Sequence, residues 1–250
     1  MNNNNLLEIK GLDLAFEDIP ILNDINLSVE AGTTHVVMGP NGAGKTTLGK
    51  AIMGDPAYTT TKGSVVFDNK DITDLSCDKR SREGVFISYQ SPIEIQGITL
   101  WSFLRSVAES HPDIKMSSRK FRKHVTGICE QLELDPSYLE REMNVGFSGG
   151  EKKKIEMLQL LLLKPKLAIL DEADSGLDVD ALKAVSKAME IYSNQMDGTL
   201  LIITHNTRIL ESVDVDKVHV LVDGHITYTS GPELIEDIND HGFAQYITKE

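Results

Sequence analysis

The chain has 250 residues, of which 40% are apolar and 25% charged, the composition of an ordinary globular protein with one sizeable core. Its 38 acidic and 25 basic residues give a net charge of −13, which disfavours binding of nucleic acid or of an anionic membrane surface. The two cysteines lie outside any CxxC pattern, no apolar run is long enough to span a membrane, and MNNNNLLEIK lacks the layout of a signal peptide, so we expect a cytoplasmic protein with no direct membrane insertion.

Residues 6–67 predict mainly β structure. The segments LEIKGLDLAF and ILNDINLSVE show partial alternation of apolar and polar residues, and GSVVFDNKDI predicts a strand that enters an Asp-Asn turn. Between them, the short β-branched run that ends at Met38 is typical of a buried parallel strand.

A glycine-rich segment follows this strand directly and precedes an amphipathic helix. It fits the pattern G-x-x-x-x-G-K-[ST], in which glycines let successive backbone N–H groups point at an anion. Lys45 would supply a positive charge for the β and γ phosphates, and the Thr46 hydroxyl suits Mg²⁺. The sequence therefore predicts a site for ATP and Mg²⁺. Its nucleotide-binding residues are Gly39, Pro40, Asn41, Gly42, Ala43, Gly44, Lys45, Thr46 and Thr47.

From residue 91 to residue 163, apolar residues recur three and four positions apart, which predicts a helical insertion. In SSRKFRKHVTGICEQLEL, Ser117 or Ser118 suits the N-cap of a helix. The apolar side of this segment consists of Phe121, Val125, Ile128, Leu132 and Leu134. Basic residues between 115 and 124 invite a nucleic-acid interpretation, but we interpret them as the solvated face of the helix.

After Pro165, strands and helices alternate again. KLAIL and TLLIIT are apolar runs of buried-strand length, and VHVLVDGHITYT predicts a hairpin that turns at Asp223-Gly224. We therefore predict a single α/β domain. Residues 6–90 and 164–250 are expected to form its catalytic lobe, and residues 91–163 a helical subdomain insertion.

Two carboxylates, Asp171 and Glu172, stand where the KLAIL strand ends. Ligands of open α/β sheets bind beyond the carboxyl ends of strands, so we predict that Asp171 joins Thr46 in holding Mg²⁺. Glu172 is predicted to polarise a water for attack on the γ phosphate. His205 is predicted to bind a γ-phosphate oxygen, so the predicted catalytic residues are Glu172, His205 and Lys45. Acids often follow a strand only to reach solvent, but the phosphate loop favours the functional interpretation.

A second glycine motif, NVGFSGGE, leads into another helix. Ser148 and Glu151 have the spacing of a capping box, which satisfies backbone N–H groups at a helix start. A capping box does not explain Gly149 and Gly150, because glycine lowers helix propensity. Glycines at a helix N-terminus suit close approach of backbone donors to an anion, so this motif predicts a second anion site.

These motifs occur in the order typical of ABC-type ATPases, which the chain resembles from about residue 6 to residue 231. FSGGE is similar to the LSGGQ signature of that family, and the phosphate loop, SYQSP, LAILDE, SGLD and His205 match further motifs. The resemblance implies a P-loop NTPase core with a mostly parallel sheet, N-terminal antiparallel β strands and a helical subdomain insertion.

The resemblance also implies a head-to-tail homodimer with two ATP molecules between its subunits. It implies that Phe16 stacks on adenine, that Gln90 is a Mg²⁺ ligand sensing the γ phosphate, and that Asp178 lies at the dimer interface. The signature residues that would contact the nucleotide of the partner subunit are Ser148, Gly149, Gly150 and Glu151.

Within the family, the chain is most similar to the ATPases of Suf-type iron–sulfur cluster assembly. Ala173 and Asp174 stand where transporter ATPases usually carry Pro-Thr or Pro-Ser, and Glu151 replaces the signature Gln. The resemblance implies that ATP closes a pair of subunits docked on SufB/SufD-type scaffold proteins, with no nucleic-acid partner. The alternative is the ATPase subunit of an ABC membrane transporter. A non-hydrolysing structural module is disfavoured because the catalytic set is complete.

Two further expectations concern the surroundings of the site. Ile93, Ile95 and Ile98 either anchor the scaffold or pack inside the helical lobe, and the sequence leaves both open. One lysine of 152–154 is expected to pair with Glu172 in an isolated monomer and hold it inactive.

Overall fold

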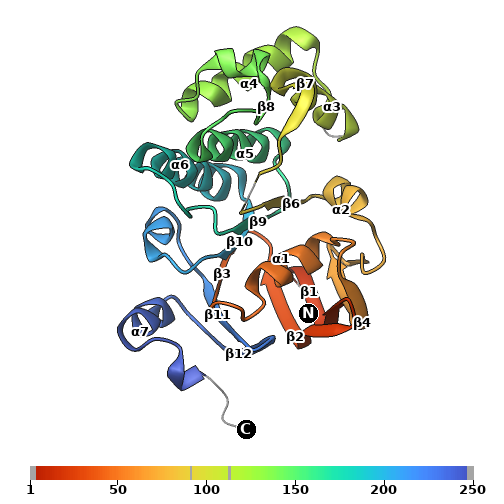
Figure 1. Ribbon diagram of the computed structural model, residues 1–250, viewed down its shortest axis with the longest axis vertical. Helices are drawn as coiled ribbons and strands as arrows, with labels where there is room; N and C mark the ends of the chain where they lie inside the picture. The colour runs from red at the N-terminus through yellow and green to blue at the C-terminus, as the bar shows by residue number, and fades with distance from the viewer. Residues whose placement is uncertain (1–3, 91, 112–113, 247–250) are drawn as a thin grey trace.

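The computed structural model describes residues 4–90, 92–111 and 114–246. Within them, the strands form a six-stranded central sheet, a four-stranded sheet near the start of the chain and a two-stranded pair in the helical region. Figure 1 shows the helical region at one end of the long axis and the four-stranded sheet towards the other. No helix in these residues has the length and apolarity that crossing a bilayer requires.

The central sheet has the strand order β12-β11-β3-β10-β9-β6. Its strands are β3 (Thr34–Met38), β6 (Val85–Ser88), β9 (Leu167–Asp171), β10 (Thr199–Ile203), β11 (Lys217–Val222) and β12 (His225–Ser230). Neighbours are parallel except β11 and β12, which form the predicted hairpin. Strands β3, β9 and β10 are buried along their whole length, which explains their mostly apolar sequences. The predicted, mostly parallel sheet is confirmed.

The four-stranded sheet has the order β2-β1-β4-β5, and its neighbouring strands are antiparallel. Its strands are β1 (Asn5–Phe16), β2 (Ile19–Glu30), β4 (Thr59–Phe67) and β5 (Lys70–Asp71). Asp68 and Asn69 turn the chain between β4 and β5 with positive φ, a conformation that these short polar side chains tolerate. The N-terminal antiparallel strands are thus confirmed.

Helices cover both faces of the central sheet (Figure 1). The α helices of the described residues are α1 (Lys45–Met53), α2 (Cys77–Glu83), α3 (Leu100–Ser110), α4 (Ser118–Gln131), α5 (Gly149–Leu163), α6 (Val179–Met196) and α7 (Glu233–His241). Short 3₁₀ segments are η1 (Pro136–Glu140), η2 (Thr207–Ser212) and η3 (Ala244–Tyr246). The helical region also contains the antiparallel pair β7 (Ile95–Thr99) and β8 (Glu142–Met143), which the sequence did not predict.

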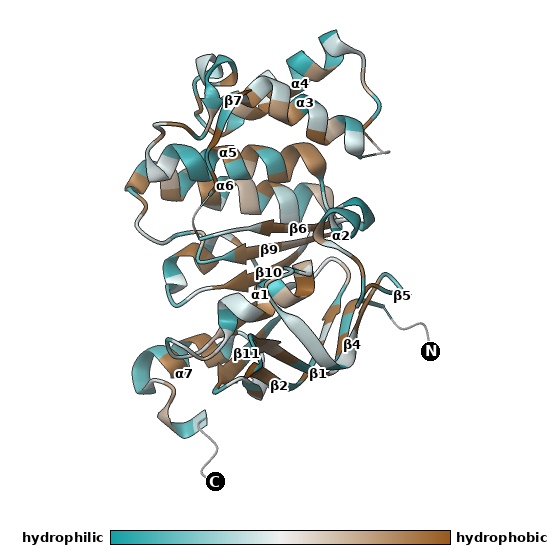
Figure 2. Ribbon diagram, turned by 45° about the vertical axis from the view of Figure 1, so that its right-hand side comes forward, coloured by the Kyte–Doolittle hydropathy of each residue, from teal (hydrophilic) through white to brown (hydrophobic). Residues whose placement is uncertain are grey.

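Consecutive residues of the central strands point to opposite faces of the sheet and so enter two hydrophobic cores. Val37 and Ile169 belong to a core shared with α1 and the N-terminal sheet. Val36 and Leu170 belong to a core shared with helices α3 to α6. Figure 2 shows these apolar strands lying between helices whose outer sides are hydrophilic. The helical region therefore shares its core with the sheet.

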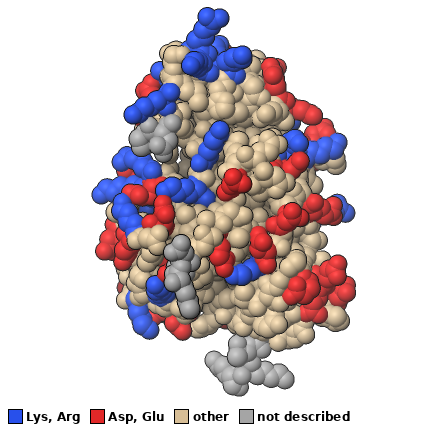
Figure 3. Space-filling model, turned by 180° about the vertical axis from the view of Figure 1, so that it is seen from behind, with Lys and Arg blue, Asp and Glu red and all other residues tan. Residues whose placement is uncertain are grey.

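Helix α4 is amphipathic, as predicted. Phe121, Val125 and Ile128 are buried, and Ser117 is the N-cap residue. The helix ends at Gln131, and the next apolar residues, Leu132 and Leu134, are buried beyond it. The basic residues Lys115, Arg119, Lys120, Arg122 and Lys123 are exposed, which fits a solvated face. Figure 3 shows lysines and arginines gathered at this end of the molecule.

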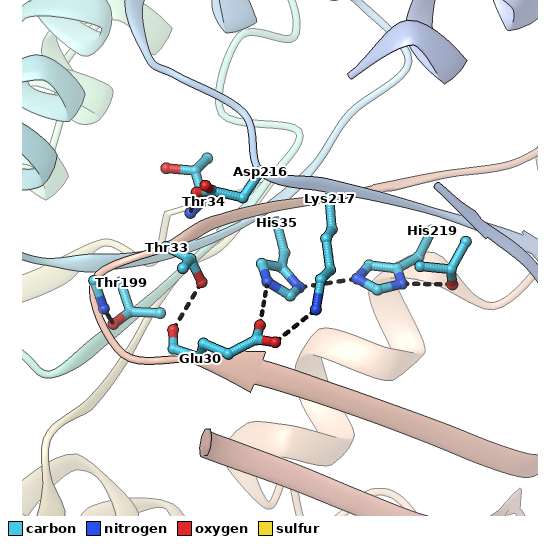
Figure 4. A network of polar contacts seen from close by, with 10 residues as sticks. Glu30, Thr33, Thr34, His35, Thr199, Asp216, Lys217 and His219 are labelled. Atoms are coloured by element: carbon cyan, nitrogen blue, oxygen red, sulfur yellow. Dashed lines mark hydrogen bonds and ion pairs between the residues drawn. The ribbon is translucent and has the colours of Figure 1, made fainter. Parts of the chain in front are cut away.

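A buried chain of polar contacts joins β2, β3, β11 and β12 (Figure 4). His35 Nε2 lies 3.1 Å from Glu30 Oε2, and because a carboxylate only accepts, this nitrogen carries the hydrogen. His35 Nδ1 then accepts from His219 Nε2 at 2.9 Å, and His219 Nδ1 accepts from the Thr229 hydroxyl at 2.9 Å. Lys217 Nζ donates to the other oxygen of Glu30 at 2.6 Å. The carboxylate of Glu30 thus sets the direction of every hydrogen bond in the chain.

Candidate ATP-hydrolysing site

The phosphate loop lies between β3 and α1, the context that its sequence pattern requires. Gly44 is the N-cap of α1 and has φ 101°, a left-handed conformation that glycine adopts without strain. No side chain caps this helix, so its first backbone N–H groups are left for a ligand. The helix dipole adds about half a positive charge at the same point. The loop can therefore hold a phosphate group.

The β11–β12 hairpin packs against the phosphate loop. A Cβ at Gly39 would stand 2.0 Å from the backbone oxygen of Leu221, so only glycine fits there. The N–H of Gly224 in the hairpin turn donates to Ala43 O at 3.1 Å, and Asn23 N donates to Gly224 O at 2.9 Å. The hairpin thus contacts the loop directly, and β2 holds the turn of the hairpin in place.

Lys45 folds back over the loop. Its ammonium group donates to the backbone oxygens of Gly39, at 2.8 Å, and Pro40, at 3.0 Å. Burial lowers the pKa of Lys45, and the negative charges of Glu172 and Asp171 oppose this shift. The lysine is thus buried at the point where the predicted phosphates would lie, with backbone oxygens as its present partners.

Thr46 and Asp171 meet, as the sequence predicts. The hydroxyl of Thr46 donates to Asp171 Oδ1 at 3.2 Å. The second oxygen of Asp171, Oδ2, is buried without a hydrogen-bond partner. Burial raises the pKa of Asp171, the hydrogen bond from Thr46 opposes this shift, and the charge of Glu172 adds to it. A buried, unpartnered carboxylate oxygen beside a hydroxyl fits a hard cation such as Mg²⁺, which Thr46 and Asp171 would hold.

Glu172 lies between two other predicted site residues. Its Oε2 accepts a hydrogen bond from Gln90 Nε2 at 2.7 Å. Its Oε1 lies 3.5 Å from His205 Nδ1. Gln90 follows β6, Glu172 follows β9 and His205 follows β10, so the carboxyl ends of parallel strands bring the three side chains together. This arrangement can orient a carboxylate towards a water.

The backbone of Glu172 is strained. Its φ is 46°, in the left-handed region that a residue with a Cβ seldom occupies, at a cost of about 1 kcal/mol. Its N–H donates to Ile203 O of β10 at 2.8 Å, which helps to hold the conformation. Other non-glycine residues also have positive φ, so the catalytic role of Glu172 stays a prediction.

The signature segment forms the predicted capping box at the start of α5. Ser148 Oγ accepts from the N–H of Glu151, and the Glu151 carboxylate accepts from the N–H of Ser148 at 2.7 Å. A Cβ at Gly150 would lie 2.8 Å from the Cβ of Ala181, so this glycine lets α5 approach α6. A Cβ at Gly149 would meet no atom within 4 Å. Packing within the chain therefore explains Gly150 and leaves Gly149 without a structural reason.

Asp178 and Phe16 are two further residues that the sequence assigns to the site. Asp178 is the N-cap of α6, and its carboxylate accepts from Ala181 N at 2.8 Å. The ring of Phe16, at the end of β1, is 39% exposed and packs 5.7 Å from the ring of Tyr58. An exposed aromatic face is compatible with stacking on a base, and the roles of both residues stay predictions.

The expectation that a lysine of 152–154 pairs with Glu172 is wrong. Their partners are Glu94 for Lys152, at 2.6 Å, Glu156 for Lys153, at 2.7 Å, and the backbone oxygen of Glu133 for Lys154, at 3.0 Å. Consecutive residues of a helix point about 100° apart, so the three lysines of α5 reach three different neighbours. Glu172 contacts Gln90 and His205 instead.

The three isoleucines differ in exposure, so packing inside the lobe holds for one of them and anchoring of a scaffold stays a prediction for the other two. Ile93 is 73% exposed and Ile98 is 42% exposed, whereas Ile95 packs against the core. Ile93 also borders a cavity of about 430 Å³ whose lining includes Thr46, Gln90 and Asp171. A larger groove, of about 760 Å³, lies between α6 and η2 and includes none of the predicted site residues.

The sequence did not predict two contacts near the site. Asp174 is buried, and its Oδ1 accepts a hydrogen bond from the Thr204 hydroxyl at 3.2 Å. The hydroxyl of Tyr138 donates to the carboxylate of Glu151, the residue that closes the capping box. Both contacts join residues that are not close in the sequence, so no local sequence pattern predicts them.

Comparison with known proteins places this site in a family. The family model described as ABC transporter matches residues 22–175. A probable ATP-dependent transporter ycf16 of Antithamnion sp. is 42% identical over 253 residues, covering 100% of this chain and 100% of that protein. Vegetative protein 296 of Bacillus subtilis (strain 168) is 44% identical over 239 residues, covering 95% of this chain and 91% of the relative.

Solved structures share the fold. The ATP binding subunit of an ABC transporter superposes with a TM-score of 0.80 at 23% identity, over 97% of this chain and 100% of that one. The dimeric ATP-binding cassette MJ0796, bound to ADP and Pi, superposes with a TM-score of 0.77 at 20% identity, over 90% of this chain and 98% of that one. The chain belongs to the ABC transporter family of ATPases, which bind and hydrolyse ATP with Mg²⁺.

Proposed function

We propose that this ATPase powers Suf-type iron–sulfur cluster assembly in the cytoplasm, in the role of the SufC subunit. The observation that carries the proposal is the Ala173-Asp174 pair directly after Glu172. Ala173 is 1% exposed and Asp174 is 8% exposed, and the Thr204 hydroxyl donates to Asp174. A buried carboxylate is costly unless it is hydrogen-bonded, so the contact with Thr204 supports an acid at this position.

The proposed chemistry is hydrolysis of the γ phosphate by an activated water. Glu172 is the proposed general base; Gln90 donates to one of its oxygens, and His205 lies 3.5 Å from the other. Lys45 binds the phosphates once its ammonium group leaves the loop oxygens. The Mg²⁺ held by Thr46 and Asp171 supplies charge stabilisation when bound.

The proposed active form is a head-to-tail homodimer. Ser148, Gly149 and Gly150 would contact the nucleotide bound by the partner subunit, and Glu151 keeps their helix start capped. The open space around Gly149 and the exposure of Ser148 support this role, because the tip of α5 faces solvent in a single chain. Asp178 lies next to Gly150, so it would reach the same interface.

The proposed partner is a SufB/SufD-type scaffold that docks on the apolar side chains beyond Gln90. Ile93 and Ile98 are exposed there, and Ile93 borders the cavity that contains Thr46 and Asp171. A partner seated on Ile93 would sense changes around the nucleotide directly. The alternative is the ATPase subunit of a membrane transporter, whose permease would use the same surface.

Affinity purification of the tagged chain from its native cells, followed by mass spectrometry, tests the proposal. We expect the wild-type chain and Met116→Asp to recover a SufB/SufD-type scaffold and Ile93→Asp to lose it. Met116 is the matched control because it is an exposed apolar residue, 40% accessible, away from the cavity. Recovery of an integral membrane permease without a scaffold would overturn the assembly role and favour the transporter alternative.

A further inference from the structure

A buried polar cluster joins helix α5 to the end of strand β6. Lys153 Nζ lies 2.7 Å from Glu156 Oε2, and the two side chains are 3% and 9% exposed. Lys153 Nζ also donates to Ser88 Oγ at 3.0 Å, and Ser88 Oγ donates to Glu156 Oε2 at 2.8 Å. Three polar side chains thus form a closed ring between α5 and β6.

The same pair holds the backbone on both sides of Tyr89. Lys153 Nζ donates to Tyr89 O at 2.5 Å, and Tyr89 N donates to Glu156 Oε1 at 3.3 Å. The next residue is Gln90, whose side chain donates to Glu172 Oε2 at 2.7 Å. Lys153 therefore fixes the peptide group between Tyr89 and Gln90. Gln90 in turn connects this peptide group to Glu172, the candidate base.

Two more contacts tie the chain beyond Gln90 to the same helix and its preceding loop. Asn144 Nδ2 donates to Ile93 O at 2.8 Å. Lys152 Nζ forms an ion pair with Glu94 Oε1 at 2.6 Å. The segment that carries Gln90 is thus held to the signature-bearing part of the chain both before and after this residue.

Stability alone does not account for the Lys153–Glu156 pair. Burial raises the pKa of Glu156, although Lys153 and the hydrogen bonds from Ser88 and Tyr89 oppose this shift. Removing two charges from water is costly, and apolar residues of similar size often stabilise a protein as well or better. The remaining donors of Lys153 are directed at Ser88 and at the peptide before Gln90.

We propose that Lys153 and Glu156 are positioning residues for ATP hydrolysis. They fix Gln90, and through it Glu172, relative to helix α5. Because α5 begins with Ser148 and Gly149, the same pair links the signature of one subunit to the base in its own nucleotide site. The proposal rests on the functions proposed above for Gln90 and Glu172.

Steady-state kinetics and nucleotide binding of Lys153→Met, with Lys154→Met as the matched control, test this proposal. Met keeps most of the aliphatic stem and removes the charge, and Lys154 lies on the same helix but donates to Glu133 O. For Lys153→Met we expect kcat to fall about 10- to 100-fold, the range for a misplaced catalytic group, while affinity for a fluorescent ATP analogue stays within about twofold. Lys154→Met should match the wild type in both.

A double variant, Lys153→Met/Glu156→Leu, separates positioning from folding. Two apolar residues leave no unpaired buried charge, so the double variant should unfold at or above the wild-type temperature, as measured by circular dichroism. If the pair only stabilises the fold, this variant will regain the wild-type kcat and the proposal is overturned. If the pair positions Gln90, kcat stays low in a stable protein.

Glu172→Gln, measured in the same series, distinguishes a failure of the proposed base from a failure of the proposed positioning role. Wild-type turnover by Glu172→Gln would refute the proposed base and with it the basis of the positioning role. Loss of turnover by Glu172→Gln together with normal turnover by Lys153→Met would refute the positioning role alone. Loss of turnover by both, with nucleotide affinity retained, supports both.

Discussion

At the residue scale, Glu30 determines the protonation of the buried histidines. Burial alone would raise its pKa, but the hydrogen bond and charge of Lys217 bring the pKa of Glu30 below its usual value, so it is ionised. Burial lowers the pKa of His219 to about 3 and also lowers the pKa of His35. Both rings are therefore neutral in the folded protein at neutral pH, and each must keep one nitrogen free to accept.

These shifts predict acid sensitivity of the fold. Because the folded-state pKa values lie below the unfolded value of about 6.5, the unfolded chain takes up protons first as pH falls. The stability is complete above pH 6.5 and is lost below it, by about 1.4 kcal/mol per pH unit for each histidine until its folded pKa is reached. Urea unfolding between pH 7.5 and 4.5 measures this slope. His219→Gln should flatten it, whereas His225→Gln, at an exposed position of β12, should not.

The two signature glycines predict opposite defects. Gly150→Ala would place a methyl group 2.8 Å from Ala181, so it should destabilise the fold by about 1–3 kcal/mol. Gly149→Ala meets open space, so its unfolding free energy should stay within about 0.5 kcal/mol of the wild type. Its ATP turnover should nevertheless fall, because the added methyl would face the nucleotide of the partner subunit. Normal turnover by a stable Gly149→Ala protein would contradict the proposed contact in trans.

Residues of the candidate site that belong to a sequence motif could be predicted from the sequence. Residues that support the site from outside the motifs could not. Lys45, Thr46 and Asp171 occupy positions that phosphate and metal geometry dictate, so spacing revealed their neighbourhood before the structure did. Lys153 stands in a run of three lysines that looks like a solvated surface. Only the packing of α5 against β6 distinguishes it from Lys152 and Lys154.

At the scale of elements, Arg80 of α2 anchors the C-terminal end of α1. Its buried guanidinium donates to the backbone oxygens of Ala51 and Ile52, both at 2.8 Å, which lie in the last turn of that helix. It also donates to Leu75 O at 2.9 Å and Thr73 O at 2.6 Å. Helix α1 starts at the phosphate loop, so this arginine supports the far end of the nucleotide-binding element.

Removing this anchor should be costly. Arg80→Ala leaves several buried carbonyl groups without donors, so we expect the unfolding free energy to fall by about 3 kcal/mol. The matched control is Arg82→Ala, two residues away, which removes only an exposed ion pair with Asp78 and should cost less than about 0.5 kcal/mol. Denaturant titration of both variants measures the difference. Equal small losses would show that the carbonyl groups find other partners.

Elements with a clear period were predicted, and very short ones were not. Strands β9 and β10 contain apolar runs of buried-strand length, and α4 has an apolar side at helical spacing, so each was visible in the sequence. Strands β7 and β8 have five and two residues with an irregular register, too few to show alternation. Their pairing is a long-range event that brings Ile95 opposite Met143.

At the scale of the whole molecule, ATP should join two copies. Glu172→Gln removes the proposed base, so bound ATP should persist and turnover should fall by orders of magnitude. Light scattering with saturating ATP and Mg²⁺ should then report a dimer, formed in the presence of the native partners if not alone. Lys45→Ala, which loses the phosphate-binding charge, should stay monomeric under the same conditions. Separated copies of Glu172→Gln in every condition would refute the dimer.

The fold class was predictable because buried parallel strands and crossover helices leave strong patterns. The division into lobes at residues 91 and 163 stays a prediction. The two hydrophobic cores were harder to predict from the sequence. Which core Val36 and Val37 each join depends on which helices cover the two faces of the sheet. That arrangement is a property of the complete chain and of no single segment.

During synthesis, residues 39–46 leave the ribosome long before the hairpin that braces them. Leu221 packs against Gly39, and Gly224 donates to Ala43, so the loop gains its final support only after about residue 224 has emerged. A nascent chain stalled before β11 therefore carries the phosphate-loop motif without the contacts from Leu221 and Gly224. We expect such a chain to bind ATP more weakly than the complete chain.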